Sequence, residues 1–226
     1  MAKKNKTISF SDFLNQLKEN SITTSKVVES KEERKYFLIV CEGERTEPQY
    51  FNYFRNLLPK KLLETIEVNG EGDNTLNIVR KALAYKEERE NNILLPNYDE
   101  VWAVYDKDDF PNERYHRAIE LANQNNINSG HSNQSFELWY VLHFEFLHSA
   151  LHGSDYIKIL SKKLGFKYEK NDERVVRYLF EKCDVRQAIK WARQLGKIHE
   201  DENPSNSCPS TQIYKLVELL LVYCEA

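Results

Sequence analysis

Two short apolar runs, each followed at once by acidic residues, dominate the pattern of the chain. They occupy residues 36–41 and 100–105. Continuous apolar runs of this length are typical of strands that are buried on both faces of a parallel sheet. Weaker runs at residues 65–68 and 127–132 predict two further strands.

Helical patterns separate these strands. Pro48 and Pro111 suit the first turns of the helices that follow the two main strands, and Thr46 is placed to cap the first of these helices. Another helix is predicted to begin near Thr75, and one more after Ser135, which we expect to cap it. This alternation implies an α/β fold with a mostly parallel central sheet, flanked by helices and joined by right-handed crossovers.

From about residue 156 the pattern becomes helical, and the last helix carries the clearest apolar stripe. We expect that stripe to be core or interface. It consists of Ile213, Leu216, Val217, Leu220 and Leu221. We predict three parts: a basic and polar leader with one short helix over residues 1–34, an α/β core over 35–150, and a helical extension packed on the core over 151–226.

Composition narrows the class of protein. The chain has 32 basic and 35 acidic side chains and a formal charge of -3, which disfavours a protein that coats nucleic acid by bulk charge. No apolar run approaches the roughly 20 residues needed to cross a bilayer, and the basic start lacks the apolar stretch of a signal peptide. The four cysteines form no CxxC pair. We therefore expect a cytoplasmic protein with reduced thiols and no membrane association.

Carboxylates gather where the two main strands end. Glu42, Glu44 and Glu47 follow the first strand, and Asp106, Asp108 and Asp109 follow the second. On an extended segment Asp106 and Asp108 would point to the same side and Lys107 away from them, and Glu42 would face the pair if the two strands are neighbours. Converging carboxylates repel one another unless a cation lies between them, and oxygen ligands favour Mg²⁺ or Mn²⁺.

Acidic loops are also commonly solvated turns or helix caps. Asp108 or Asp109 could cap the helix that follows them, and Glu137 could serve the first turn of another helix. The metal interpretation is favoured here because the acids directly follow buried strands. Gly43, beside Glu42, also marks a sharp turn of the backbone.

Several stretches of the chain together resemble the RloB-like, or AbiL-type abortive infection, family. They occur in the family's order and extend from about residue 35 to residue 220. Gln134 stands where the family more often has proline, which loosens a turn but removes no chemistry. The matching stretches are IVCEGERTEPQYF at residues 39–51, VYDKD at 104–108, SNQSFELW at 132–139, LHF at 142–144 and PST at 209–211.

The resemblance implies a Toprim-type catalytic domain, as in topoisomerases, primases and OLD-type nucleases. In that fold a glutamate after the first strand and a DxD pair after the third bind a divalent metal, and these roles fall on Glu42, Asp106 and Asp108. Phe110 and Pro111 stand where many Toprim domains have glycine, so the loop departs from the pattern there. The family's usual setting is bacterial anti-phage defence, commonly beside a partner ATPase of the ABC or AAA type.

The resemblance also suggests a division of labour in a nuclease. Asp106 and Asp108 would hold the metal, and Glu42 would complete its shell or act as the general base. Lys107 and Arg45 are predicted to bind the substrate and to steady the phosphate charge.

Four further residues are predicted to support these ligands. Glu137 is a candidate for a second metal or for orienting His143, and Glu47 and Asp109 stand beside the ligands in the sequence.

The leading hypothesis is therefore a Mg²⁺- or Mn²⁺-dependent nuclease that acts on DNA or RNA, tRNA included, as a defence effector. Two alternatives stay open: nucleotidyl or phosphoryl transfer at the same site, and a non-catalytic interaction module that regulates the ATPase. The chain has no P-loop, so any ATP dependence would come from a partner. The oligomeric state, a homo-oligomer included, is left open.

Basic residues recur through the helical part of the chain. They could track a nucleic-acid backbone, or they could belong to ordinary solvated helix faces. These residues are Arg174, Arg177, Lys182, Arg186, Lys190, Arg193 and Lys197.

Overall fold

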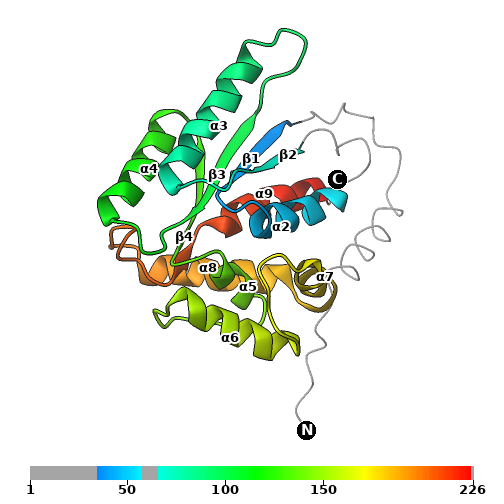
Figure 1. Cartoon of the computed structure of the whole chain (residues 1–226), viewed down its shortest axis with the longest axis vertical. Coiled ribbons are helices and arrows are strands. Elements are labelled where there is room, and N and C mark those ends of the chain that lie inside the picture. The colour runs from blue at the N-terminus through cyan, green and yellow to red at the C-terminus, as the bar shows by residue number, and fades with distance from the viewer. Residues whose placement is uncertain (1–34, 58–65, 225–226) are drawn as a thin grey trace, which may run out of the picture.

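The computed structural model describes residues 35–57 and 66–224, so the predicted leader over residues 1–34 and its short helix lie outside the described residues. The described part contains a sheet of five strands in the order β2-β1-β3-β4-β5 (Figure 1). The strands are β1 (Phe37–Cys41), β2 (Ile66–Gly70), β3 (Glu100–Asp106), β4 (Asn128–Asn133) and β5 (Ser210–Thr211).

The two main apolar runs are neighbours at the centre of this sheet. β1 and β3 pair in parallel, with Phe37 opposite Glu100 and Cys41 opposite Val104. β2 and β4 extend the parallel part on either side, and the short β5 pairs antiparallel with β4. The two strands that end near residues 41 and 106 are therefore neighbours, which is the condition for their acidic residues to converge, whereas β5 was not predicted.

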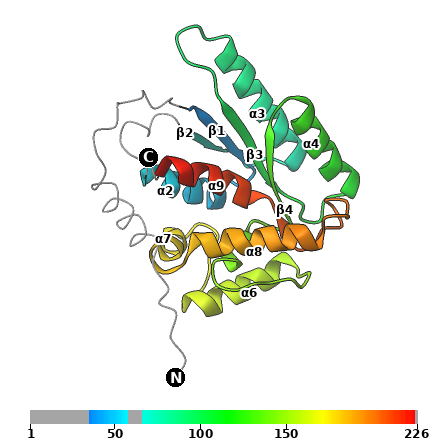
Figure 2. The ribbon, with the colours of Figure 1, turned by 180° about the vertical axis from the view of Figure 1, so that it is seen from behind.

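Helices cover both faces of the sheet. α3 and α4 lie on one face, and α2 and α9 lie on the other, with the remaining helices packed beyond α2 and α9 (Figures 1 and 2). The helices are α2 (Thr46–Asn56), α3 (Thr75–Glu90), α4 (Asn112–Gln124), α5 (Glu137–Val141), α6 (Gly153–Leu164), α7 (Glu173–Lys182), α8 (Val185–Ile198) and α9 (Ile213–Cys224). Within the described ranges, no helix combines the length and the apolar character needed to cross a membrane.

Burial on both faces explains why β1 is apolar at every position. Phe37, Ile39 and Cys41 belong to the core between the sheet and helices α2 and α9, whereas Leu38 and Val40 belong to the core beneath α3 and α4. An alternating strand would place polar side chains in one of these cores. The predicted α/β class, with a mostly parallel sheet and a helical C-terminal part, is confirmed.

Two expected helix caps, Thr46 and Ser135, are wrong. Thr46 is the first residue of α2 rather than its cap, and its hydroxyl donates to the carbonyl oxygen of Lys170. Ser135 does not cap α5, because Phe136 holds that position, and the buried Ser135 Oγ has no hydrogen-bond partner among the described residues. Pro111 stands at the N-cap of α4 without a side-chain hydrogen bond, so neither of the aspartates before it caps this helix.

Gly70, at the end of β2, lets the loop after β1 pack against the sheet. A Cβ atom at this position would lie 2.6 Å from Cγ of Pro48 and 2.8 Å from the carbonyl oxygens of Gly43 and Glu44. These contacts are much closer than van der Waals distance, and two of them are to backbone. The loop that carries Glu42 to Glu47 therefore depends on a bare backbone at Gly70.

We expect Gly70→Ala to lower the free energy of unfolding by about 1–3 kcal/mol, because the added methyl must push the loop away from the sheet. Urea unfolding followed by circular dichroism measures the change. Gly196→Ala is the matched control: nothing lies within 4 Å of a Cβ atom there. Because Gly196 is inside α8, its replacement should raise stability by about 0.5–1 kcal/mol. Equal effects of the two substitutions would contradict the packing argument.

Candidate functional site

Two carboxylates, each held by a backbone amide, stand at the ends of the two central strands. Glu42 directly follows β1, and its Oε2 accepts a hydrogen bond from the backbone N–H of Asp106, the last residue of β3, at 2.8 Å. The backbone N–H of Glu42 in turn donates to the carbonyl oxygen of Val104 at 2.8 Å. Asp106 Oδ2 accepts from the backbone N–H of Phe136 at 3.0 Å. Backbone amides therefore hold both carboxylates in place.

A cleft of about 470 Å³ opens beside Asp106. Four of its lining side chains are carboxylates, from Glu44, Glu47, Asp106 and Glu137, and two are cationic, from Arg45 and Lys170. Its lining comes from the loop after β1, the start of α2, the end of β3, the start of α5 and the loop before α7. The lining residues are Gly43, Glu44, Arg45, Thr46, Glu47, Asp106, Phe136, Glu137, Lys170 and Asn171.

These carboxylates are costly to ionise together. Burial, followed by the charges of Glu47, Asp108, Glu137 and Glu42, raises the pKa of Asp106 well above its ordinary value. Burial is also the main cause that raises the pKa of Glu42 and the pKa of Glu47 from 4.5 to about 7. For Glu42 the hydrogen bond from Asp106 opposes the rise but does not cancel it. The charge of the cleft therefore favours protonation of these carboxyl groups or the binding of a cation.

Lys170 is the cation that lies among these acids. Its Nζ is 3.6 Å from Glu137 Oε1, and the charges of Glu137, Asp106, Asp108 and Glu47 raise its pKa, with Glu137 the largest cause. Glu137 also accepts a hydrogen bond from the hydroxyl of Tyr168 at 3.1 Å. Glu137 is thus held by the loop before α7.

Gly43 leaves the space that the Glu47 carboxylate occupies. A Cβ atom on Gly43 would lie 2.1 Å from Oε2 of Glu47. Glu47 is only 6% exposed, so its carboxylate has little room to move aside. The turn after β1 therefore folds the side chain of Glu47 back over its own loop.

The sequence pattern predicted an extended backbone after β3, but the structure does not have one there. Asp108 has a φ of 42°, in the left-handed region, so the alternation that would align it with Asp106 is broken. Neither Glu42 nor Asp108 is among the residues that line the cleft, although the charge of Asp108 acts on both Glu42 and Asp106. Lys107 is buried, and its Nζ donates to the carbonyl oxygen of Phe110 at 2.7 Å. Its ammonium group is thus held by its own loop.

Two of the predicted supporting residues lie away from the cleft lining. The Asp109 side chain is 82% exposed, with its carboxylate 3.8 Å from Nε2 of His152. His143 lies in the core, where its Nδ1 is 2.9 Å from the carbonyl oxygen of Trp139 and burial lowers its pKa to about 4. The described contacts of Glu137 are to Tyr168 and Lys170, not to His143.

Lys170 and Asn171 are the cleft residues that sequence reasoning missed. They lie in the loop between α6 and α7, more than 60 residues after Asp106. A lone lysine in a polar loop carries no chemical pattern of its own. Only the packing of this loop on Thr46, whose hydroxyl donates to the carbonyl oxygen of Lys170, brings it to the acids.

The donors present suit a hard divalent cation, but not a complete protein cage. Among residues 35–57 and 66–224, no group of three or more histidine, cysteine, aspartate or glutamate side chains is arranged to hold a metal ion. Mg²⁺ in enzymes typically keeps several waters and is held by one or two carboxylates together with substrate phosphates. The pair formed by Glu42 and Asp106 fits that kind of site.

A model of the family described as RloB-like protein matches residues 37–220. The chain belongs to the RloB-like family. The match runs from the first residue of β1 into α9, so it includes every residue that lines the acidic cleft of this RloB-like chain. No curated protein and no solved structure matches the chain.

The raised pKa of Glu47 makes the stability of this RloB-like protein depend on pH. The unfolded carboxyl ionises near its ordinary pKa of 4.5 and the folded one near 7, so between these values the folded state binds more protons. Stability is therefore lost as pH rises through this window. We expect Glu47→Gln to remove this loss and to raise the free energy of unfolding at pH 8 by about 1–3 kcal/mol, with little effect at pH 4.5.

Urea unfolding at several pH values between 4.5 and 8 measures this dependence. Glu44→Gln removes the same charge from an exposed position in the same loop and should leave the pH profile of the wild type unchanged. A Glu47→Gln profile parallel to that of the wild type would show that Glu47 ionises without a penalty.

Proposed function

We propose that the acidic cleft is the active site of a Mg²⁺- or Mn²⁺-dependent nuclease that hydrolyses phosphodiester bonds. The observation that carries this proposal is the hydrogen bond of 2.8 Å by which the backbone of Asp106 holds the carboxylate of Glu42. It brings two carboxylates from neighbouring parallel strands to one edge of the sheet. Ligands of open parallel sheets bind at that edge, beyond the carboxyl ends of the strands.

Resemblance supports the same chemistry. Glu42 stands after the first strand, and Asp106 and Asp108 stand at the end of the neighbouring strand β3 and just after it, as the glutamate and the DxD pair do in Toprim-type domains. Membership of the RloB-like family supports a role as an effector of bacterial anti-phage defence beside a partner ATPase. DNA and RNA, tRNA included, are the substrates that we propose.

In this proposal Glu42 and Asp106 hold the metal, with Asp108 close enough to act on both through its charge. A bound metal would supply polarisation of the phosphoryl oxygen and an activated water. Arg45 and Lys170 line the cleft and would meet the phosphate, which gives Lys170 the place that the sequence suggested for Lys107. Glu47, with a pKa of about 7, is suited to exchange a proton near neutral pH.

A non-catalytic module that regulates an ATPase is the second candidate. The observation that favours it is that the described residues form no group of three metal-binding side chains. The two candidates differ in the nucleic-acid cleavage rate, because only an enzyme needs the carboxylates of Glu42 and Asp106 for catalysis.

We expect purified protein with Mn²⁺ or Mg²⁺ to cleave DNA or tRNA, alone or when the proposed partner ATPase is added. Asp106→Asn and Glu42→Gln should each lower the cleavage rate by at least about 100-fold, because each removes a charged metal ligand while keeping its shape. Gel electrophoresis of end-labelled substrate measures the rates.

Glu113→Gln, an exposed carboxylate in the first turn of α4, is the matched control and should cleave like the wild type. Cleavage that survives both Asp106→Asn and Glu42→Gln would place the active site elsewhere. If all preparations are inactive while the chain changes the ATP hydrolysis rate of the ATPase, the regulatory module is the correct function.

A further inference from the structure

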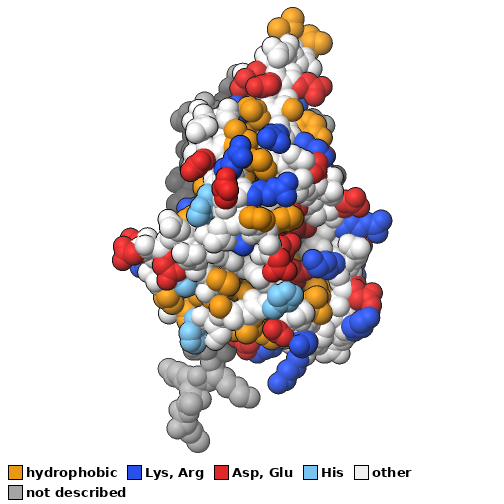
Figure 3. Space-filling model, turned by 60° about the vertical axis from the view of Figure 1, so that its left-hand side comes forward, with side chains coloured by type: hydrophobic (Ala, Val, Ile, Leu, Met, Phe, Trp, Pro, Cys, Tyr) orange, Lys and Arg blue, Asp and Glu red, His pale blue; other side chains and the backbone are white. Residues whose placement is uncertain are grey.

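The loop between α3 and β3 carries three large aliphatic side chains in solvent. Ile93, Leu94 and Leu95 are 96%, 86% and 45% exposed. They lie at the end of the projection formed by α3 and β3, where Figure 3 shows hydrophobic side chains at the upper end of the molecule. Consecutive exposed aliphatic side chains on a projection are typical of an interaction surface. We call these three residues the apolar tip.

The backbone of the apolar tip is fixed by hydrogen bonds. Asn92 accepts the backbone N–H of Leu94 with its Oδ1 and that of Leu95 with its carbonyl oxygen, both at 3.1 Å. Arg89 donates from Nε to the carbonyl oxygen of Pro96 at 2.7 Å, and its guanidinium lies 4.6 Å from the ring centre of Tyr98. The aliphatic side chains are therefore presented by an ordered turn, which lowers the entropy lost on docking.

Three acidic side chains lie near the apolar tip, at the end of α3, with Arg89 among them. Glu87, Glu88 and Glu90 are exposed in the last turns of α3. This negative collar disfavours an anionic lipid surface or a nucleic acid as the partner, because both repel carboxylates. It favours an apolar surface with a basic rim.

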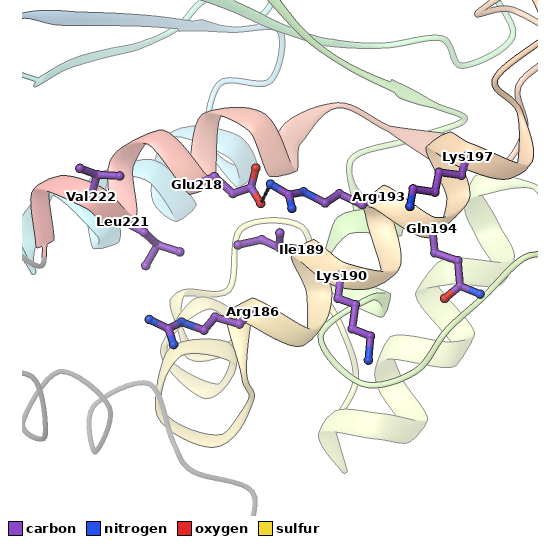
Figure 4. Close-up of a pocket in the computed structure, with 9 residues that line it drawn as sticks. All are labelled: Arg186, Ile189, Lys190, Arg193, Gln194, Lys197, Glu218, Leu221 and Val222. Carbon is purple, nitrogen blue, oxygen red and sulfur yellow. Dashed lines mark ion pairs between the residues drawn. The ribbon is translucent and has the colours of Figure 1, made fainter.

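Such a surface exists on the same chain. A groove of about 860 Å³ lies between α8 and α9, which run side by side (Figures 2 and 4). Its floor is aliphatic, from Ile189 on α8 and from Leu221 and Val222 on α9, and Val222 is 61% exposed. Its rim carries the basic side chains of Arg186, Lys190, Arg193 and Lys197.

The rim keeps positive charge available. Arg193 is paired with Glu218 at 2.6 Å, but Lys190 and Lys197 are exposed and form no ion pair within the described part of the chain. The rim and the floor thus match the two properties of the apolar tip, its acidic collar and its aliphatic end. Arg186 is the remaining charged residue in the groove lining.

We infer that the apolar tip of one copy of this chain docks in the α8–α9 groove of a second copy. The contact is heterologous, because the tip and the groove are different surfaces of one molecule. They lie apart on the surface, at the end of the α3–β3 projection and between α8 and α9, so one copy uses both at once (Figure 2). Association of this kind continues into rings or open chains. This inference does not depend on the proposed nuclease activity.

Sedimentation velocity over about 1 to 200 μM protein, a range suited to a weak contact of small area, tests the inference. The full-length wild type should form dimers and larger species as concentration rises, and less so at high salt, since the collar and the rim are exposed charges. Leu94→Lys brings a positive charge to the basic rim, and Val222→Lys places one on the aliphatic floor. Each should weaken association by at least about tenfold.

Mixing the two variants gives the decisive result. Leu94→Lys protein keeps an intact groove and Val222→Lys protein keeps an intact tip, so the mixture should form a dimer of one copy of each and nothing larger. Gln124→Lys, at the exposed end of α4, is the control substitution and should associate like the wild type. A wild type that stays monomeric, association that both variants retain, or a mixture that does not dimerise would each overturn the inference.

Discussion

The parallel pairing of β1 with β3 is the constraint on which the rest of the structure depends. Both strands are buried on both faces, and they end at the same edge of the sheet. Glu42 is tied to β3 twice, by its backbone N–H to Val104 and by its carboxylate to the backbone N–H of Asp106. The apolar character of the two strands thus fixes the position of the two carboxylates. The helices then close the site around this edge.

This arrangement concentrates negative charge where burial makes it expensive. Asp106, Glu47 and Glu137 are each less than 9% exposed, and Lys170 lies beside them as a cation. A protein does not gain stability from buried like charges, which cost free energy unless a proton or a cation is bound. In the proposed function, a divalent cation would offset the charge of these acids, and the phosphate bound with it would meet the neighbouring Arg45 and Lys170.

Much of the fold could be predicted from the sequence, because strands buried on both faces and a long amphipathic helix leave clear apolar patterns. The runs around Ile39 and Ala103 predicted the two central strands, and the stripe through Leu216 predicted the buried face of α9. Local polar contacts could not be predicted in the same way. Thr46 is a suitable cap by residue type, but its hydroxyl is taken by a carbonyl 124 residues later in the chain. The left-handed backbone conformation of Asp108 likewise produces no pattern of apolar and polar residues from which it could be predicted.

The central claim is that Glu42 and Asp106 form a site for a divalent cation. Titration of the protein with Mn²⁺, followed by the electron paramagnetic resonance signal of free Mn²⁺, tests it without reference to turnover or to a partner. The account predicts that wild type and Glu113→Gln bind Mn²⁺ alike and that Asp106→Asn binds at least about tenfold more weakly. Equal Mn²⁺ binding by wild type and Asp106→Asn, or no binding by any of the three proteins, would contradict it.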